Sequence, residues 1–163
     1  MKNSDSDNYG QALQYAFLLL RYRDRSEKEI VSRLQKKGFI EETGGKVRDY
    51  LKDKGFIDDL RLAESLKRNA VEQKHLGKAG VFRYLLLRGI PAGTAKDMAG
   101  ADDDDVYAGS AAVLVERKLK QYAGLDEMTV KRRLWAALAR KGYSPEVIRK
   151  ALKKFPEIEG SDL

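Results

Sequence analysis

Apolar residues recur along this chain at the spacing of amphipathic helices, and one pattern occurs four times. In each copy a basic residue precedes a glycine, a large apolar residue follows it, a leucine lies four residues before it and an aliphatic residue eight before it. Positions four and eight residues before the glycine share one face of a helix. The pattern therefore predicts four helices that bury this face and end at the glycine. The glycines are Gly38, Gly55, Gly89 and Gly142, the leucines Leu34, Leu51, Leu85 and Leu138, and the aliphatic residues Ile30, Val47, Val81 and Leu134.

The residues around each glycine predict how these helices end. A glycine after the last turn can adopt the left-handed conformation, and the basic residue before it faces the negative end of the helix dipole. The apolar residue after it then covers the last turn. Gly38, Gly89 and Gly142 are 51 and 53 residues apart, which predicts three repeats of roughly fifty residues each.

Few windows resemble strands, so the chain is predicted to be all-α, a tandem array of three three-helix repeats with about nine helices, elongated and curved. One repeat is too small for a good core, so neighbours should share apolar surface. The repeats are expected at 9–58, 59–105 and 106–155, between a disordered tail at 1–8 and a disordered acidic tail at 156–163. The helices are expected at 11–22, 26–37, 41–54, 58–74, 78–88, 91–98, 106–122, 126–141 and 144–154.

The net charge of +7 is unevenly distributed. Residues 61–96 carry +6 and residues 106–155 carry +8, whereas residues 97–105 carry −5. Such an imbalance indicates a polyanion or an acidic protein surface as partner, and solvated helix faces of a basic protein account for it equally well. The chain has no cysteine, no apolar run of the ~18–20 residues that span a membrane and no signal-peptide pattern at its start. These features predict a soluble cytoplasmic protein.

Enzymatic interpretations find little support. His75 is the only histidine, which leaves little material for a catalytic triad or a histidine metal site. The run Asp102 to Asp105 lacks the alternating ligands and the glycine of a calcium loop, and it is better interpreted as a linker and helix cap. Gly44-Gly45-Lys46 lacks the first glycine and the spacing of a phosphate-binding loop. We therefore expect a non-enzyme without cofactor or metal.

Basic residues are the remaining candidates for function. Arginine clusters bind phosphates and carboxylates alike, because the guanidinium donates two parallel hydrogen bonds. Each residue alone is typical of a solvated or ion-paired surface, but together on a curved array they could line a groove. Aromatic residues such as Trp135 and Tyr143 could stack on bases, although a core or cap role is favoured for each. The predicted basic face consists of Lys67, Arg68, Lys74, Lys78, Arg83, Arg88, Lys131, Arg132 and Arg133.

The order of these elements resembles the RecX family of regulators of the RecA recombinase, over roughly residues 11–155. Residues 25–39 (RSEKEI, then Leu34 and Lys37-Gly38-Phe39) resemble the opening unit of that family, and residues 55–63 (GFIDDLRLA) are similar to its signature. Gly77-Lys78 with residues 85–90, and residues 131–143, match the later units. Leu62 stands where the signature usually has phenylalanine, a conservative change for a packed position.

The resemblance implies a tandem three-helix-repeat protein that binds in the groove of the RecA filament on DNA. It implies restraint of filament growth, strand exchange, ATP hydrolysis and coprotease activity, and hence regulation of recombination, DNA repair and the SOS response. DNA, single- or double-stranded, is a further expected partner, contacted directly or within the filament. The chain is expected to be a monomer that does not contact a membrane.

The signature residues are interpreted as structural. Asp58 and Asp59 are expected to cap a helix and to fix the joint between the first two repeats. Arg61 is expected either to form a salt bridge or to belong to the binding face. The four glycines Gly38, Gly55, Gly89 and Gly142 complete this structural signature.

Two other functions remain open from sequence alone. The repeated basic helix favours a stand-alone nucleic-acid-binding module, but the chain lacks an aromatic-rich platform or a recognition-helix pattern. A structural adaptor with unrelated acidic protein partners is also compatible, because an all-α repeat does not by itself choose a function.

Overall fold

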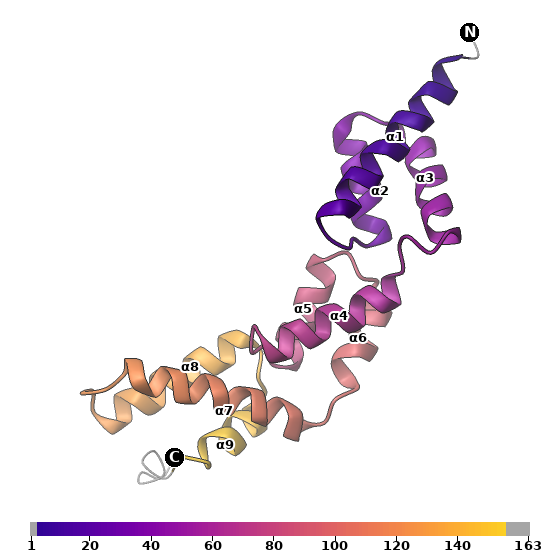
Figure 1. Ribbon diagram of the computed structural model, residues 1–163. Helices are drawn as coiled ribbons and strands as arrows, with labels where there is room; N and C mark the ends of the chain where they lie inside the picture. Colours follow the sequence, from indigo (N-terminus) through magenta and orange to yellow (C-terminus); the bar gives the residue numbers. More distant parts are fainter. Residues whose placement is uncertain (1–2, 156–163) are drawn as a thin grey trace.

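The computed structural model describes residues 3–155, and in this range the chain forms nine α-helices and no strand (Figure 1). The all-α prediction is therefore confirmed. Helices α1–α3 form unit 1, α4–α6 form unit 2 and α7–α9 form unit 3. The bounds are α1 Asn3–Tyr22, α2 Glu27–Lys37, α3 Glu41–Asp53, α4 Asp59–Glu72, α5 Lys78–Leu87, α6 Ala92–Gly100, α7 Asp104–Gln121, α8 Glu127–Lys141 and α9 Pro145–Leu152.

The units follow one another along an elongated, bent array, with the two ends of the chain at opposite ends of the molecule (Figure 1). The first helix begins earlier than predicted, at Asn3 instead of residue 11, so its backbone includes most of the stretch expected as a tail. Helix α7 also begins earlier, at Asp104, because Asp103 caps it by accepting from the amides of Asp105 and Val106. Positions 1–2 and the acidic segment 156–163 lie outside the described residues.

The four repeated glycines share one helix-ending geometry. Gly38, Gly55, Gly89 and Gly142 have φ values of 101°, 72°, 77° and 89°, in the left-handed region. In each turn the amide of the following apolar residue donates to the carbonyl of the leucine four residues before the glycine, at 2.8–3.3 Å. This is the Schellman motif, which satisfies carbonyls left free at a helix end. All eight leucine and aliphatic positions of the pattern are at most 1% exposed, so they anchor the cores.

Two separate hydrophobic clusters make up the core of the described residues. One belongs to unit 1 and includes Ala16, Ile30 and Leu51. The other runs continuously through units 2 and 3. Neighbouring units therefore share apolar surface between units 2 and 3, but units 1 and 2 meet differently.

The joint between units 1 and 2 is polar. The amide of Glu27, in the first turn of α2, donates to Oδ1 of Asp59 at 2.9 Å. Arg88 at the end of α5 donates to the carbonyl oxygen of Asp24 at 3.3 Å, and its Nε lies 3.7 Å from a carboxylate oxygen of Glu29. A Cβ on Gly89 would lie 2.3 Å from Oγ of Ser26, which caps α2. The glycine is therefore required for this contact as well as for its positive φ.

The joint between units 2 and 3 uses backbone contacts. Gly77, which precedes α5, donates its amide to the carbonyl of Lys141 at 3.0 Å, and Ala79 donates to the carbonyl of Gly142 at 3.2 Å. A Cβ on Gly80 would lie 2.1 Å from the carbonyl oxygen of Lys141. The last turn of α8 thus contacts the first turn of α5 without space for a side chain.

Both joints follow one rule, in which the end of the second helix of a unit packs on the start of the second helix of the preceding unit. Helix α8 ends against the start of α5, and α5 ends against the start of α2. These helices consequently follow one another along the array (Figure 1). At the joint of α8 with α5, carbonyls at the negative end of one helix dipole accept from amides at the positive end of the next, which is electrostatically favourable.

Candidate partner-binding surface

Two of the predicted basic residues stabilise the array. Nζ of Lys67 lies 2.8 Å from Oδ1 of Asp102, with the Lys67 side chain 16% exposed. Arg88 joins unit 2 to unit 1 and is 19% exposed in its side chain. Both cations are therefore engaged inside the protein.

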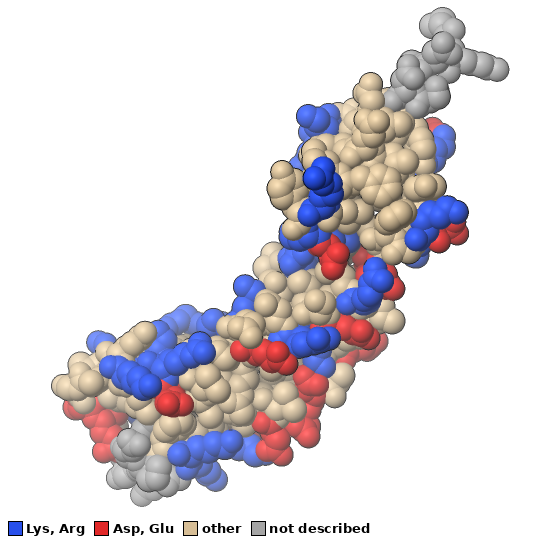
Figure 2. All heavy atoms as spheres, in the orientation of Figure 1, with Lys and Arg blue, Asp and Glu red and all other residues tan. Residues whose placement is uncertain are grey.

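Three other predicted residues are exposed at separate places. Arg68 on α4 lines an open pocket of about 570 Å³ together with Glu64 and Glu72. Lys78 extends toward Gly100 at the end of α6, with Nζ 4.0 Å from the position of a Cβ there. Arg133 on α8 stacks over the ring of Tyr122, 5.8 Å from its centroid. Figure 2 shows basic and acidic side chains interspersed over the visible face.

Five cations gather where α4, α5, α7 and α8 meet. We call them the joint cluster: Lys74, Arg83, Arg117, Arg140 and Lys141. Nζ of Lys74 lies over the ring of Tyr84, 5.3 Å from its centroid. Nζ of Lys141 donates to the carbonyl of Lys74 at 2.9 Å, and Arg83 reaches the carbonyl of Arg140 at 3.5 Å. Hence the joint that holds units 2 and 3 together also concentrates positive charge.

His75 lies under this cluster and is 6% exposed. Its Nδ1 is 3.3 Å from Oγ of Ser110, which donates to the carbonyl of Val71 at 2.7 Å and accepts from the hydroxyl of Tyr143 at 3.2 Å. Nε2 of His75 is buried without a hydrogen-bond partner. Burial lowers the pKa of His75, and the positive charges of Arg117 and Lys141 lower it further. Burial and, to a lesser degree, these cations therefore favour the neutral form of this core histidine.

Burial has the opposite effect on two phenols of the shared core. It raises the pKa of Tyr143 to about 12 and that of Tyr107 also to about 12. The hydroxyl of Tyr107 donates to the carbonyl of Ala99 at 2.8 Å. These two tyrosines are thus packing residues, and they are not available to stack on bases.

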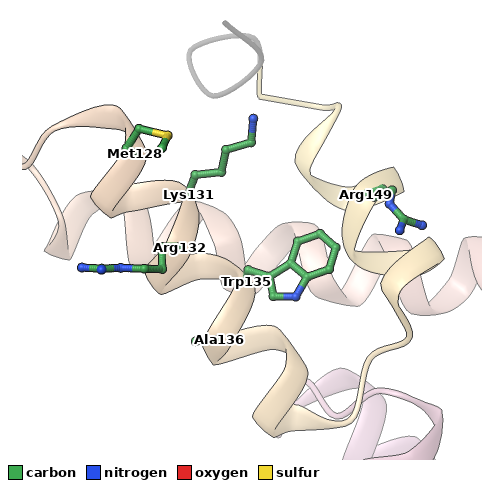
Figure 3. Close-up of a pocket in the computed structure, with 6 residues that line it drawn as sticks. All are labelled: Met128, Lys131, Arg132, Trp135, Ala136 and Arg149. Atoms are coloured by element: carbon green, nitrogen blue, oxygen red, sulfur yellow. The ribbon is translucent and has the colours of Figure 1, made fainter. Parts of the chain in front are cut away.

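Apart from the joint cluster, unit 3 has a pocket that is open on its surface and has a volume of about 670 Å³. We call it the Trp135 pocket. Trp135 projects from α8 toward α9, and the guanidinium of Arg149 lies 5.9 Å from the centre of its ring (Figure 3). The pocket combines apolar groups with three cations. Its lining residues are Met128, Lys131, Arg132, Trp135, Ala136 and Arg149.

The signature residues lie at the joint between units 1 and 2. Oδ1 of Asp58 accepts from the amides of Leu60 and Arg61 at 3.0 Å and so caps α4. Asp59 caps α2 through the Glu27 amide, and burial raises the pKa of Asp59. Arg61 reaches back to the carbonyl of Gly55 at 3.4 Å. One aspartate therefore caps its own helix and the next one caps a helix of the neighbouring unit.

The aspartate run after α6 is engaged in pairing and capping. Asp102 pairs with Lys67, Asp105 pairs with Lys150, and Asp103 caps α7. Among residues 3–155 there is no group of three or more His, Cys, Asp or Glu side chains that could hold a metal ion. A search of the same residues for membrane-spanning helices finds none with the required length and hydropathy.

From sequence, Gly77 was noted only as part of the RecX resemblance, and its role at the joint was not predicted. No role was predicted for Gly80, Arg117 or Arg149. Aligning the units at their glycines would have pointed to the role of Gly77. It lies twelve residues before Gly89, as Ser26 lies twelve residues before Gly38. Both positions precede the second helix of a unit. Arg117 and Arg149 gave no such signal, because their importance comes from contacts between helices.

Comparison with known proteins identifies the relatives of this chain. A family model described as RecX, third three-helix domain, matches residues 105–152, and one described as RecX, first three-helix domain, matches residues 12–44. Regulatory protein RecX of Amycolatopsis mediterranei is 30% identical over 153 residues, which cover 91% of this chain and 87% of the relative. The protein of the same name from Mycobacterium tuberculosis is 31% identical over 86% of this chain and 83% of its own length.

A solved structure shows the same architecture. The crystal structure of RecX from Lactobacillus salivarius superposes with a TM-score of 0.81 at 21% identity, covering 93% of this chain and 98% of that one. At this identity the likeness concerns the fold. The sequence relationship goes further, and it shows that this chain belongs to the RecX family.

Proposed function

We propose that this protein regulates a RecA-type recombinase by binding its filament on DNA and restraining its ATP hydrolysis, strand exchange and coprotease activity. The observation that carries the proposal is the 30% identity to a regulatory protein RecX across 91% of the chain. In this role the chain is a cytoplasmic monomer that acts by binding, without catalysis or a cofactor, and so regulates DNA repair.

The shape of the array supports this function. Three units in an elongated, bent row can follow a helical groove over several subunits of a filament (Figure 1). The joint cluster places five cations at the centre of units 2 and 3, where they can meet acidic protein surface or DNA phosphates. Modest contacts spread over the units would then limit filament growth without a deep binding site.

The contacts of the predicted basic residues support dividing them into three groups. Lys74 and Arg83 belong to the joint cluster, and Lys131 and Arg132 belong to the Trp135 pocket. We propose these two sites as the binding surface, with Arg68, Lys78 and Arg133 contributing individually. Lys67 and Arg88 support it indirectly, because they hold the units in position.

Co-sedimentation tests this function. The cognate recombinase is assembled on single-stranded DNA, and the protein is added at moderate salt. We expect the chain to pellet with the filament and to remain in solution with recombinase alone. Pelleting with DNA alone but no enrichment on the filament would instead indicate a stand-alone nucleic-acid-binding module.

A further inference from the structure

Alignment of the three units shows that the Trp135 pocket lies at a position that recurs in every unit. When the units are aligned at Gly38, Gly89 and Gly142, Trp135 corresponds to Val31 and Phe82, each seven residues before its glycine. The position three residues earlier is occupied in the three units by Lys28, Ala79 and Arg132. The position one residue later is occupied by Ser32, Arg83 and Ala136. Each second helix therefore presents an equivalent face.

In unit 1 this face lies beside unit 2, across an open groove of about 980 Å³. A Cβ on Gly89 would lie 3.3 Å from Cβ of Lys28. Val31 and Ser32 line a groove whose other wall is formed by unit 2 residues that include Ile90 and Ala92. The face of α2 is thus an interface between repeats.

In unit 2 the equivalent face contacts unit 3, although the side chains of Ala79 and Arg83 remain exposed. The amide of Ala79 donates to the carbonyl of Gly142 at 3.2 Å, and Arg83 reaches the carbonyl of Arg140 at 3.5 Å. Phe82 packs against the cluster that units 2 and 3 share. This face, too, is an interface between repeats.

Unit 3 has no further repeat after it within the described residues, and there the equivalent face forms the Trp135 pocket. Met128, which lines the pocket, is 68% exposed, and Leu125 before α8 is 39% exposed. A terminal repeat normally presents a polar outer face. The apolar groups of this pocket therefore mark the surface where a further protein element would dock.

The charges at this surface limit what can occupy it. Lys131, Arg132 and Arg149 surround the apolar groups, so the occupant must carry carboxylates or phosphates (Figure 3). A second copy would bring the free end of its α2, where Lys36 and Lys37 lie, and would be repelled. Arg149 already lies over the ring of Trp135, which is where a base would stack. An acidic protein segment satisfies both the charge and the apolar surface.

We propose that the Trp135 pocket docks a segment of the recombinase that presents carboxylates around one large apolar side chain. This proposal rests on the proposed function, because it takes its partner from there. The segment occupies the position that the next repeat occupies on units 1 and 2. The recombinase thereby continues the array, and the joint cluster remains available for other contacts.

Site-specific photo-crosslinking tests the docking. The crosslinking amino acid p-benzoylphenylalanine replaces Met128 in the full chain, and in a control protein it replaces Tyr22, which is 80% exposed on unit 1. Both proteins are irradiated on recombinase filaments, and the products are mapped by mass spectrometry. We expect position 128 to link to an acid-rich recombinase peptide at least tenfold more efficiently than position 22.

The other outcomes overturn the proposal. If the protein pellets with the filament but position 128 links to DNA, to a second copy or to residues 156–163 of its own chain, the docking site is wrong while the proposed function stands. Absence of any enrichment on the filament removes both the function and the partner named for the pocket.

A charge reversal provides an independent measurement. Arg132→Glu changes an exposed rim residue, and Lys36→Glu makes the same change on α2. We expect the first variant to need at least tenfold more protein for half-maximal binding to the filament and the second to stay within about twofold of the parent. Equal effects of the two variants would contradict docking at the pocket.

Discussion

Gly77 and Gly80 are needed at the joint between units 2 and 3 because a larger residue would not fit there, and not because of their backbone conformation. Gly77 and Gly80 have ordinary φ values, but a Cβ on either would lie 2.4 or 2.1 Å from the backbone of the α8 end. Such distances force the backbones apart, because neither partner is a flexible side chain. The α5–α8 contact therefore requires residues without a Cβ at positions 77 and 80.

Replacement of Gly80 by alanine is expected to destabilise the protein by about 1–3 kcal/mol, the usual cost of overpacking. The matched control is Gly93→Ala in α6, where a Cβ would meet nothing within 4 Å. This control should be neutral or stabilising by a few tenths to ~1 kcal/mol, since alanine favours the helix. Urea unfolding of the two variants measures both effects. Equal stabilities would mean that the α5–α8 contact is not close-packed.

His75 makes stability depend on pH. Because its pKa is lowered in the folded protein, the unfolded chain, with a pKa near ~6.5, binds a proton first as the pH falls. The folded state should therefore lose stability as the pH falls below about 7, and the loss should stop below the folded pKa. His75→Asn tolerates the positive φ of 48° and can still donate to Ser110, so it serves as the control. Melting temperatures between pH 8 and 5 should fall less steeply for this variant; parallel curves would contradict the assignment.

At the scale of elements, one aspartate pair caps helices in two different units. Asp58 caps α4, and Asp59 caps α2 through an amide 32 positions away in sequence. The sequence pattern indicates helix starts, and it predicts that both aspartates fix the joint. It contains no signal that assigns Asp59 to Glu27, because that pairing depends on how α2 and α4 approach each other.

Alanine variants of the two aspartates should separate these roles. Asp58→Ala should speed hydrogen exchange at the amides of Leu60 and Arg61, and Asp59→Ala should do so at Glu27. Each loss of a cap is expected to cost about 1 kcal/mol. Exchange measured residue by residue by NMR gives the result. An Asp59→Ala variant with unchanged exchange at Glu27 would show that the two units are joined by other contacts.

The helices and their ends were largely predictable, whereas the binding surface was not. The Leu-Gly pattern places all four left-handed turns, because both the face and the cap are local properties of the chain. The role of Lys67 depends on Asp102, 35 positions away, and that of Arg88 depends on Asp24, 64 positions away. The packing of the units therefore decides which cations stay exposed and which hold the fold together.

At the scale of the whole molecule, the array consists of two bodies of different size. Unit 1 has its own hydrophobic cluster, while units 2 and 3 share one. The two bodies are joined by the hydrogen bonds Glu27–Asp59 and Arg88–Asp24 and by the ion pair Arg88–Glu29. Salt weakens an ion pair to the extent that it is exposed. This distribution lets unit 1 open or unfold independently of the rest.

Core substitutions in the two bodies should therefore act differently. Ile30→Ala in unit 1 and Leu134→Ala in unit 3 each remove a side chain that is at most 1% exposed, and each should cost about 2–5 kcal/mol locally. The first should lower exchange protection in unit 1 alone. The second should lower it in units 2 and 3 together. Loss of protection throughout the chain in both variants would show that the whole array unfolds as one unit.

If this array restrains a recombinase filament, it should lower the DNA-dependent ATP hydrolysis of the recombinase. The protein is titrated into the cognate recombinase on single-stranded DNA, at concentrations below that of the recombinase. Contacts that restrain a growing filament should suppress hydrolysis at these substoichiometric ratios. Unchanged hydrolysis at equimolar protein, with DNA binding by the chain intact, would contradict the account.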